Sequence, residues 1–201
     1  MARDSTARPA NAMPPTRRPS EPRDRLLRTA SELFYREGIH AIGVDRIVSE
    51  AGITRATFYR HYPAKEDLVT AYLDREDTLF RDALSDAIGA DSTPEEVLET
   101  VIATIADDVA RNHTRGCPFI NAAAEYPDAT GPVRQLIGRH REWFRATVES
   151  ALDNAGRDTP TERARTVVLL RDGALVGGYL DGPSDVGPAF QRAARAAAGL
   201  V

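Results

Sequence analysis

Cysteine and lysine are almost absent from this sequence of 201 residues. It has one cysteine, Cys117, and one lysine, Lys65, and all its other Lys+Arg residues are arginine. A single cysteine cannot form an internal disulfide bond, which favours a reducing compartment. The first residues contain no apolar run, so we expect no signal peptide, and no stretch approaches the ~18 apolar residues that span a membrane. We therefore expect a cytoplasmic protein that has no membrane partner.

Catalytic motifs are also missing. The sequence has no H-E-x-x-H, no glycine-rich phosphate loop and no G-x-S-x-G, and its four histidines and 30 acidic residues form no convergent motif. We expect no catalytic residues, no metal site and no cofactor. An enzyme with a helical core is therefore disfavoured.

The charge is distributed unevenly along the chain. Residues 1–65 contain 12 Lys+Arg and 7 Asp+Glu, a net charge of +5, whereas residues 66–201 contain 14 and 23, a net charge of −9. A cationic front and an anionic remainder suggest that the front binds a polyanion. The alternative is a chance clustering of arginine in a disordered tail, where four of the 12 lie: Arg3, Arg8, Arg17 and Arg18.

The periodicity of apolar residues predicts helices and no strands. Residues 1–22 contain five prolines and are predicted to form a disordered arm. Helical spacing, glycine stops and proline starts then predict about nine helices. Their expected ranges are 23–37, 44–51, 55–61, 65–88, 94–109, 118–125, 132–154, 161–180 and 188–199. The fold class is therefore all-α.

The second and third of these helices have the spacing of a helix-turn-helix, a motif whose second helix enters the DNA major groove. Phe58 is expected to point inward, while small Ala56 lets the helix approach the groove. The side chains that can reach bases or phosphates are Arg55, Thr57, Tyr59, Arg60, His61 and Lys65. The arrangement predicts binding to double-stranded DNA.

The run "GVDRIVSEAGITRATFYRHYPAKEDLVTAYL", residues 43–73, resembles the DNA-binding signature of the TetR (tetracycline-repressor) family. The resemblance implies that Thr54 caps the recognition helix and contacts phosphate, and that His61 and Lys65 contact the DNA backbone. Two positions depart from the family pattern. Gly43 replaces the usual Thr or Ser at the N-cap of the second helix, and Tyr62 replaces the usual Phe, with its hydroxyl expected at the domain edge.

The resemblance also implies two domains. These are a three-helix DNA-binding domain at 23–67 and a helical effector-binding and dimerisation domain at 68–201. The segment "RGCPFINAAAEYPD", residues 115–128, resembles a run in one group of these regulators.

Aromatic and aliphatic side chains of the second domain are candidates for an effector pocket, although each is also compatible with an ordinary core position. The candidates are Phe80, Ile102, Ile105, Val109, Cys117, Phe119, Trp143 and Phe144. Cys117 is either an inert buried thiol or a redox sensor whose pKa Arg115 could lower.

Small residues near the end of the chain suggest close helix–helix contact. Gly173, Ala174, Gly177 and Gly178 lie within one predicted helix, where glycine is otherwise unfavourable. Contact within the monomer is the alternative to a dimer. The candidate dimer residues are Val168, Leu169, Asp172, Leu175, Val176 and Tyr179.

The combined interpretation is a ligand-responsive transcriptional repressor. A homodimer binds a near-palindromic operator, and an unidentified small-molecule effector releases it. A transcriptional activator and a DNA-binding protein without ligand control remain alternatives.

Overall fold

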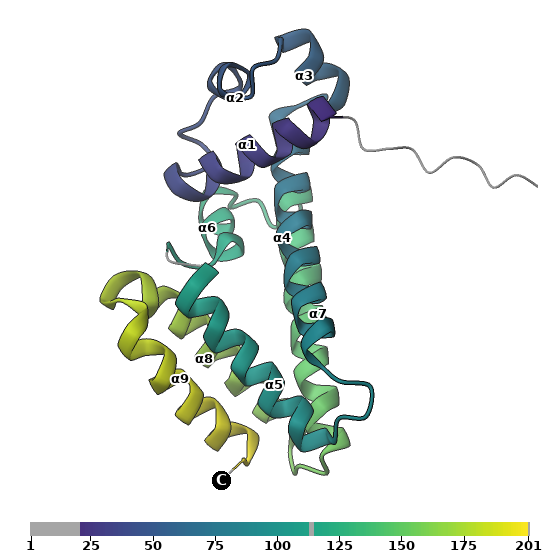
Figure 1. The fold of residues 1–201 in the computed structure, drawn as a ribbon, viewed down its shortest axis with the longest axis vertical. Coiled ribbons are helices and arrows are strands. Elements are labelled where there is room, and N and C mark those ends of the chain that lie inside the picture. Colours follow the sequence, from purple (N-terminus) through teal and green to yellow (C-terminus); the bar gives the residue numbers. More distant parts are fainter. Residues whose placement is uncertain (1–20, 113–114, 201) are drawn as a thin grey trace, which may run out of the picture.

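The computed structural model describes residues 21–112 and 115–200, and this part of the chain is helical, without strands (Figure 1). The predicted all-α class is thus confirmed, while most of the predicted arm, residues 1–20, lies outside the described residues. The helices are α1 (Glu21–Glu37), α2 (Val44–Glu50), α3 (Arg55–His61), α4 (Lys65–Ala87), α5 (Pro94–Asp107), the π-helical turn η1 (Asp108–Asn112), α6 (Pro118–Glu125), α7 (Pro132–Asn154), α8 (Pro160–Asp181) and α9 (Pro183–Ala198).

Proline determines where the later helices begin. Each of the helices α5 to α9 has proline in its first turn. Proline suits this position because its fixed φ is helical and its missing N–H would have no partner there. The predicted starts of α5, α6 and α7 are therefore confirmed.

Three predicted starts are wrong, that of α8 by a single residue, since it begins at Pro160 rather than at residue 161. Helix α1 begins at Glu21 rather than at residue 23, with acidic Glu21 and Asp24 in a first turn whose dipole favours negative charge. Helix α9 begins at Pro183 rather than at residue 188, so Pro188 lies inside it. Gly187 precedes Pro188, and having no Cβ it avoids part of the clash that normally keeps the residue before proline out of a helix.

Helices α1 to α3 and the start of α4 form a small head at one end of the molecule (Figure 1). The head encloses its own apolar core, in which Leu26, Ile47, Phe58 and Leu68 are fully buried. Helix α4 then leaves the head and runs beside α7 into a larger body.

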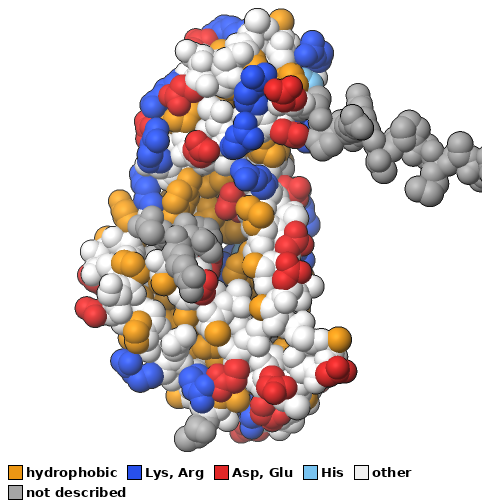
Figure 2. Space-filling view, in the orientation of Figure 1, with side chains coloured by type: hydrophobic (Ala, Val, Ile, Leu, Met, Phe, Trp, Pro, Cys, Tyr) orange, Lys and Arg blue, Asp and Glu red, His pale blue; other side chains and the backbone are white. Residues whose placement is uncertain are grey.

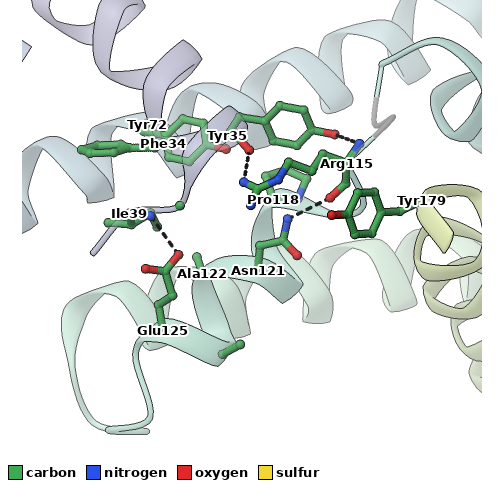
Figure 3. A pocket seen from close by; sticks show the side chains of 12 residues that line it. Phe34, Tyr35, Ile39, Tyr72, Arg115, Pro118, Asn121, Ala122, Glu125 and Tyr179 are labelled. Carbon is green, nitrogen blue, oxygen red and sulfur yellow. Dashed lines mark hydrogen bonds between the residues drawn. The ribbon is translucent and has the colours of Figure 1, made fainter. Parts of the chain in front are cut away.

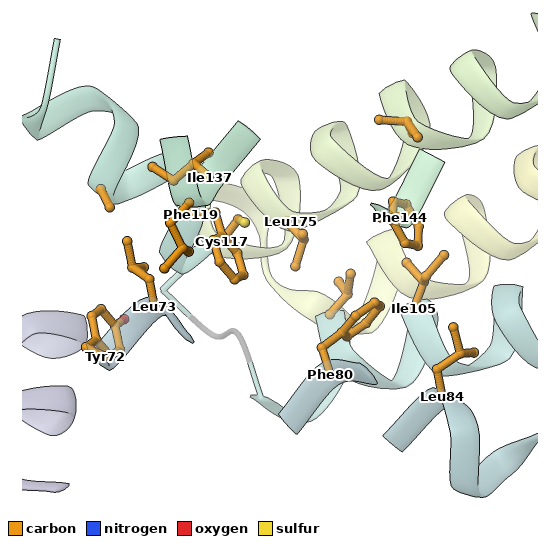
Figure 4. Packing of buried hydrophobic residues seen from close by; sticks show 14 of the residues in the cluster. Tyr72, Leu73, Phe80, Leu84, Ile105, Cys117, Phe119, Ile137, Phe144 and Leu175 are labelled. Atoms are coloured by element: carbon orange, nitrogen blue, oxygen red, sulfur yellow. The ribbon is translucent and has the colours of Figure 1, made fainter. Parts of the chain in front are cut away.

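The body is a bundle in which α8 packs against α7 and α9, and α5 packs against α9 and α7. Its interior is rich in aromatic side chains, including Phe80, Phe119 and Phe144 (Figure 4). The short helix α6 lies between α1 and the rest of the body (Figure 1). It is therefore placed to contact both parts of the molecule.

Candidate nucleic-acid interface

The turn between α2 and α3 depends on one glycine. Gly52 has φ of +62°, a conformation that favours glycine because it lacks a Cβ. The turn is closed by the backbone N–H of Ile53, which donates to the carbonyl of Val48 at 3.0 Å. These features set the angle between the two helices of the predicted helix-turn-helix.

Thr54 caps α3, as predicted. Its hydroxyl accepts a hydrogen bond from the backbone N–H of Thr57 at 3.2 Å, and the two hydroxyl groups lie 3.0 Å apart. Such a cap satisfies a free N–H of the first turn and typically contributes about 1 kcal/mol. Both hydroxyl groups are therefore engaged with each other at the start of the helix.

The two faces of α3 differ as expected from helical geometry. Phe58 is fully buried in the head and makes an edge contact with the ring of Tyr59 at 5.1 Å. Arg55, Ala56 and Arg60 are exposed, as is Tyr59 with 49% of its surface accessible. Figure 2 shows Lys and Arg side chains over much of the head, while Asp and Glu side chains gather along the edge of the body below it.

Arg55 and His61 are less accessible to DNA than the sequence suggested, Arg55 because of an ion pair and His61 because of partial burial. The guanidinium of Arg55 forms an ion pair with Asp45 on α2, which raises the Arg55 pKa. To contact DNA, Arg55 has to leave this carboxylate. His61 is half-buried, and its Nε2 has no hydrogen-bond partner among the described residues.

Lys65 has a structural contact. Its ammonium donates to the carbonyl of Ile39 at 2.6 Å and lies 5.8 Å from the centre of the Phe34 ring. Partial burial lowers the Lys65 pKa. The sole lysine therefore joins the start of α4 to the turn after α1. Two of its three N–H donors are left for another partner.

The two departures from the family pattern have different surroundings. Gly43 lies at the N-cap of α2, with no side-chain cap and no atom within 4 Å of the place that a Cβ would occupy. Tyr62 is buried, and its hydroxyl is buried as well and has no hydrogen-bond partner among the described residues. The expectation that this hydroxyl lies at the domain edge is wrong, because the ring packs inward 6.2 Å from Phe58.

The predicted pocket residues form core rather than a cavity lining. Seven of them are buried, Trp143 is half-buried, and none lines either of two cavities found among the described residues. The larger, of about 740 Å³, is an open groove between α4, α5 and the start of α9. Helical spacing could not separate a cavity wall from a packed interior, because both are apolar.

The smaller cavity, of about 220 Å³, lies where the head meets the body. Its lining includes Tyr35 from α1, Tyr72 from α4, Arg115 and Asn121 near α6, and Tyr179 from α8 (Figure 3). The sequence pointed to none of these as pocket residues except through the run 115–128, which contains Arg115 and Asn121. That run was the only signal of this site.

Hydrogen bonds tie the start of the α6 segment to the end of α1. The hydroxyl of Tyr35 accepts from the backbone N–H of Arg115 at 2.8 Å and donates to the carbonyl of Gly116 at 3.1 Å. The guanidinium of Arg115 donates to the carbonyl of Tyr35 at 2.7 Å. The side chain of Tyr35 thus fixes α1 to the chain that leads into α6.

The other end of α6 holds the turn between α1 and α2. The carboxylate of Glu125 accepts from the backbone N–H of Ile39 at 2.8 Å and from that of His40 at 2.5 Å (Figure 3). The chain that leads into α6 and the C-terminal end of α6 are therefore both hydrogen-bonded to the head.

Cys117 is buried, and burial raises the pKa of its thiol. The cation that opposes this effect is Arg171, not Arg115 as expected from sequence proximity. A protonated, buried thiol is a poor nucleophile. The structure therefore favours the inert alternative over a redox sensor.

The predicted dimer residues divide between two faces of α8. Val168 and Leu175 are buried inside the monomer, because residues seven apart share a helix face. Leu169 is 70% exposed, and Val176 and Tyr179 are also exposed. Leu180 was not among the predicted dimer residues, although it is exposed to the same extent as Leu169.

The glycines of α8 also divide between positions packed inside the monomer and exposed positions. A Cβ added at Gly178 would lie 3.1 Å from a methyl group of Val109, so this glycine allows close packing within the monomer. Asp172 is partly buried and forms an ion pair with Arg141 at 2.8 Å. Gly173, in contrast, is exposed and has no atom within 4 Å of an added Cβ. Contact within the monomer therefore explains Gly178, while a role of Gly173 in a dimer stays a prediction.

Two classes of site are not found in the described part of the chain. Its His, Cys, Asp and Glu side chains form no group of three that could hold a metal ion. No helix described here has the length and apolar character needed to cross a membrane.

Comparison with known families matches both parts of the molecule. Residues 26–72 match the family model described as "Bacterial regulatory proteins, tetR family", and residues 94–164 match that described as "Tetracyclin repressor-like, C-terminal domain". The relatives that carry these domains are transcriptional regulators and not enzymes.

Individual relatives extend over most of the chain. The uncharacterized HTH-type transcriptional regulator Rv1255c of Mycobacterium tuberculosis is 31% identical over 156 residues, which are 76% of this chain and 74% of the relative. The HTH-type transcriptional repressor NemR of Escherichia coli is 22% identical over 162 residues, 76% of this chain and 81% of the relative. The crystal structure of SCO4454, a TetR-family transcriptional regulator from Streptomyces coelicolor, has a TM-score of 0.85 at 41% identity, covering 90% of this chain and 95% of that one.

Proposed function

This chain belongs to the TetR family of bacterial DNA-binding transcriptional regulators, and on that premise we propose that it is a repressor released by a small-molecule effector. The homodimer binds a near-palindromic operator on double-stranded DNA in the cytoplasm. The observation that carries this proposal is the outward face of α3, where Arg55, Tyr59 and Arg60 are exposed around the small Ala56. NemR of Escherichia coli, which is named a transcriptional repressor, aligns with this chain over 81% of its length, and this is consistent with a repressor role.

The dimer uses the exposed apolar face of α8. Leu169, Val176 and Leu180 follow one another at spacings of seven and four along this helix and remain exposed in the monomer, with Gly173 between them. Large exposed apolar side chains that line up on one face mark an interaction surface. A two-fold dimer through this face presents two copies of α3 to half-sites about 34–36 Å apart.

The effector acts through α6 and α4. Helix α6 holds the end of α1 and the turn after it through Arg115 and Glu125, and α4 runs from the head into the body. An effector that prefers a body conformation with α6 displaced shifts the dimer away from the DNA-binding arrangement. Its differential affinity for the two conformations sets the size of the response.

The direct test is fluorescence anisotropy with the intergenic DNA beside the protein's own gene. Tyr59→Ala and Arg60→Ala are expected to weaken specific binding at least tenfold, whereas Arg139→Ala, at an exposed position of α7, leaves it unchanged. Specific binding that survives both α3 variants would reject the assignment of this surface. Affinity that does not fall with added salt would argue against phosphate contacts.

A reporter under the neighbouring promoter gives the sign of regulation. Deletion of the gene raises expression if the protein is a repressor. A fall in expression would assign it as an activator instead, while leaving the DNA interface intact.

A further inference from the structure

Two of the buried polar atoms of the body that have no hydrogen-bond partner among the described residues belong to side chains that are almost completely buried. They are Nε of Arg171 on α8 and Nε2 of His140 on α7. Only 3% of the surface of Arg171 and 1% of that of His140 is accessible. A buried polar group without a partner costs about 1–3 kcal/mol, and more if it is charged. Two such groups in one interior require an explanation.

Both groups lie against the same aromatic ring. The centre of the His140 ring is 6.1 Å from that of Phe80, and the guanidinium carbon of Arg171 is 5.5 Å from it. Arg171 also lies 4.8 Å from the centre of the Phe144 ring, and Phe119 stacks on His140 at 3.8 Å with an angle of 7° between the planes. The two polar atoms therefore share one aromatic environment, and Figure 4 shows the rings of Phe80, Phe119 and Phe144 that form it.

Hydrogen bonding fixes which form of His140 is present. Its Nδ1 lies 2.7 Å from Asp77, a carboxylate that also accepts from Arg81 at 2.8 Å. Since a carboxylate only accepts, Nδ1 carries the proton, and burial lowers the His140 pKa to about 4. The imidazole is thus neutral near pH 7, and its Nε2 offers a lone pair to a donor.

The surrounding ion pairs leave a positive charge at Arg171. Asp77 pairs with Arg81, and Asp172 pairs with Arg141 at 2.8 Å. Arg171 reaches Asp172 only at 3.5 Å, through a carboxylate that is already neutralised. In this cluster three guanidinium groups face two carboxylates, and the surplus cation is the most deeply buried of the three.

From these contacts we propose that Arg171 and His140 form the recognition site for a small aromatic anion that carries a hydroxyl group. The guanidinium of Arg171 donates to the carboxylate of the ligand, and Nε2 of His140 accepts from the hydroxyl. The rings of Phe80, Phe119 and Phe144 pack as core in the free protein, and on binding they separate to contact the flat body of the ligand. This inference rests on the proposed function, because it assigns the chemical class of the effector.

The same geometry links the ligand to the head. In the free protein the ring of Phe119 covers His140, so a ligand that bonds to Nε2 has to displace a ring that covers it. Phe119 belongs to α6, which also carries Glu125, the residue that holds Ile39 and His40 of the head. Entry of the ligand therefore moves the helix on which the position of the head depends.

The test measures thermal unfolding and calorimetric binding of the purified protein without DNA. The probes are benzoate, the hydroxybenzoate isomers and the corresponding hydroxybenzamides. At least one hydroxybenzoate is expected to raise the melting temperature more than benzoate does, and the neutral amides are expected to have no effect. Failure of every acid to bind, or equal binding of acids and amides, would overturn the proposal.

Variants separate recognition from structure. Arg171→Met is expected to abolish the shift by hydroxybenzoate and to raise the melting temperature of the free protein, because it removes a poorly compensated buried charge. A purely structural arginine predicts the opposite, a lower melting temperature. Arg75→Met, at an exposed position of α4, keeps the wild-type shift.

Two further variants keep the test decisive if Arg171→Met does not fold. Arg171→Lys retains the cation with a single nitrogen and is expected to weaken binding at least tenfold. His140→Phe is expected to bind benzoate and hydroxybenzoate equally. Wild-type affinity in either variant would refute the site. Ligand binding by a protein that does not bind the operator would reject the proposed repressor function alone.

Discussion

The head and the body of this molecule bury different kinds of side chain. The core of the head consists of apolar groups such as Phe58 and Ile47, with neutral polar atoms such as the Tyr62 hydroxyl among them, and no charged side chain of its described residues is fully buried. The body encloses Arg171 and His140 among aromatic rings. An apolar core stabilises one conformation, whereas a buried charge that lacks a full set of partners is stabilised by whatever binds it. This contrast is consistent with the proposed roles, in which the head binds DNA and the body binds the effector.

The largest predicted effect comes from truncating Phe58, the buried aromatic side chain at the centre of the head's core. Phe58→Ala is expected to destabilise the head by about 3–5 kcal/mol, because the buried ring leaves a cavity. The only tryptophan of the chain, Trp143, lies in the body, so its fluorescence reports the body alone. In thermal unfolding, circular dichroism should show that part of the helix is lost at a lower temperature than in the wild type. The unfolding transition followed by Trp143 fluorescence should remain near its wild-type temperature.

Tyr59→Ala is the matched control for this experiment. The side chain is adjacent but exposed, so its removal should change stability by less than about 0.5 kcal/mol. If Phe58→Ala shifts the Trp143 transition as far as the loss of helix, the two parts unfold as one unit.

The second prediction concerns pH and the body. Burial lowers the His140 pKa to about 4, below its ordinary value, so the unfolded chain binds the proton more strongly than the folded one. The body is therefore expected to lose stability as the pH falls from about 6.5 towards 4, by about 3 kcal/mol in total. The groups that face His140 are Asp77 and Arg81 on α4 and Arg171 on α8.

Denaturant unfolding followed by Trp143 fluorescence measures this dependence. His140→Gln keeps a donor for Asp77 but does not titrate, so its stability should vary much less over the same pH range. An equal loss in both proteins would assign the pH dependence to other groups.

The third prediction sharpens the boundary between the two parts. Glu125→Gln weakens two charge-assisted hydrogen bonds to the head, at a cost of about 1–2 kcal/mol. Amide hydrogen exchange at Ile39 and His40 should become roughly tenfold faster, while amides in α8 keep their wild-type rates. Glu142→Gln, an exposed residue of α7 that pairs only with Arg145, is the control. Unchanged exchange at Ile39 would show that α6 does not hold the head.

The head was far more predictable from sequence than the body. Gly52, Thr54 and Phe58 act through neighbours within a few residues, so spacing alone identified the turn, the cap and the inward face. Prolines in the first turn likewise identified where several helices of the body begin, because this signal is also local in sequence. Leu175 and Val176 show the limit of this approach, because the face on which each lies depends on the packing of whole helices.

The missed residues of the body depend on contacts between distant segments. Tyr35 and Arg115 are 80 positions apart, and no local pattern indicates that they hydrogen-bond. Arg171 interrupts an apolar run in the sequence, where it is indistinguishable from the exposed Arg165 of the same helix. Only the packing of α7 and α8 shows that one is buried and the other is not.

The smallest predicted effect returns to the head, where the N-cap of α2 has no side chain. Gly43→Ser is expected to stabilise the head by a few tenths of a kcal/mol, about 0.3, since serine exceeds glycine only slightly at this position. The backbone suits the change, with φ of −82° and no atom within 4 Å of an added Cβ. The larger effect should appear in DNA affinity, where a new hydroxyl adds a phosphate contact. Gly43→Ala adds the same Cβ without the hydroxyl, so anisotropy titrations in which both variants gain affinity equally would assign the gain to backbone rigidity instead.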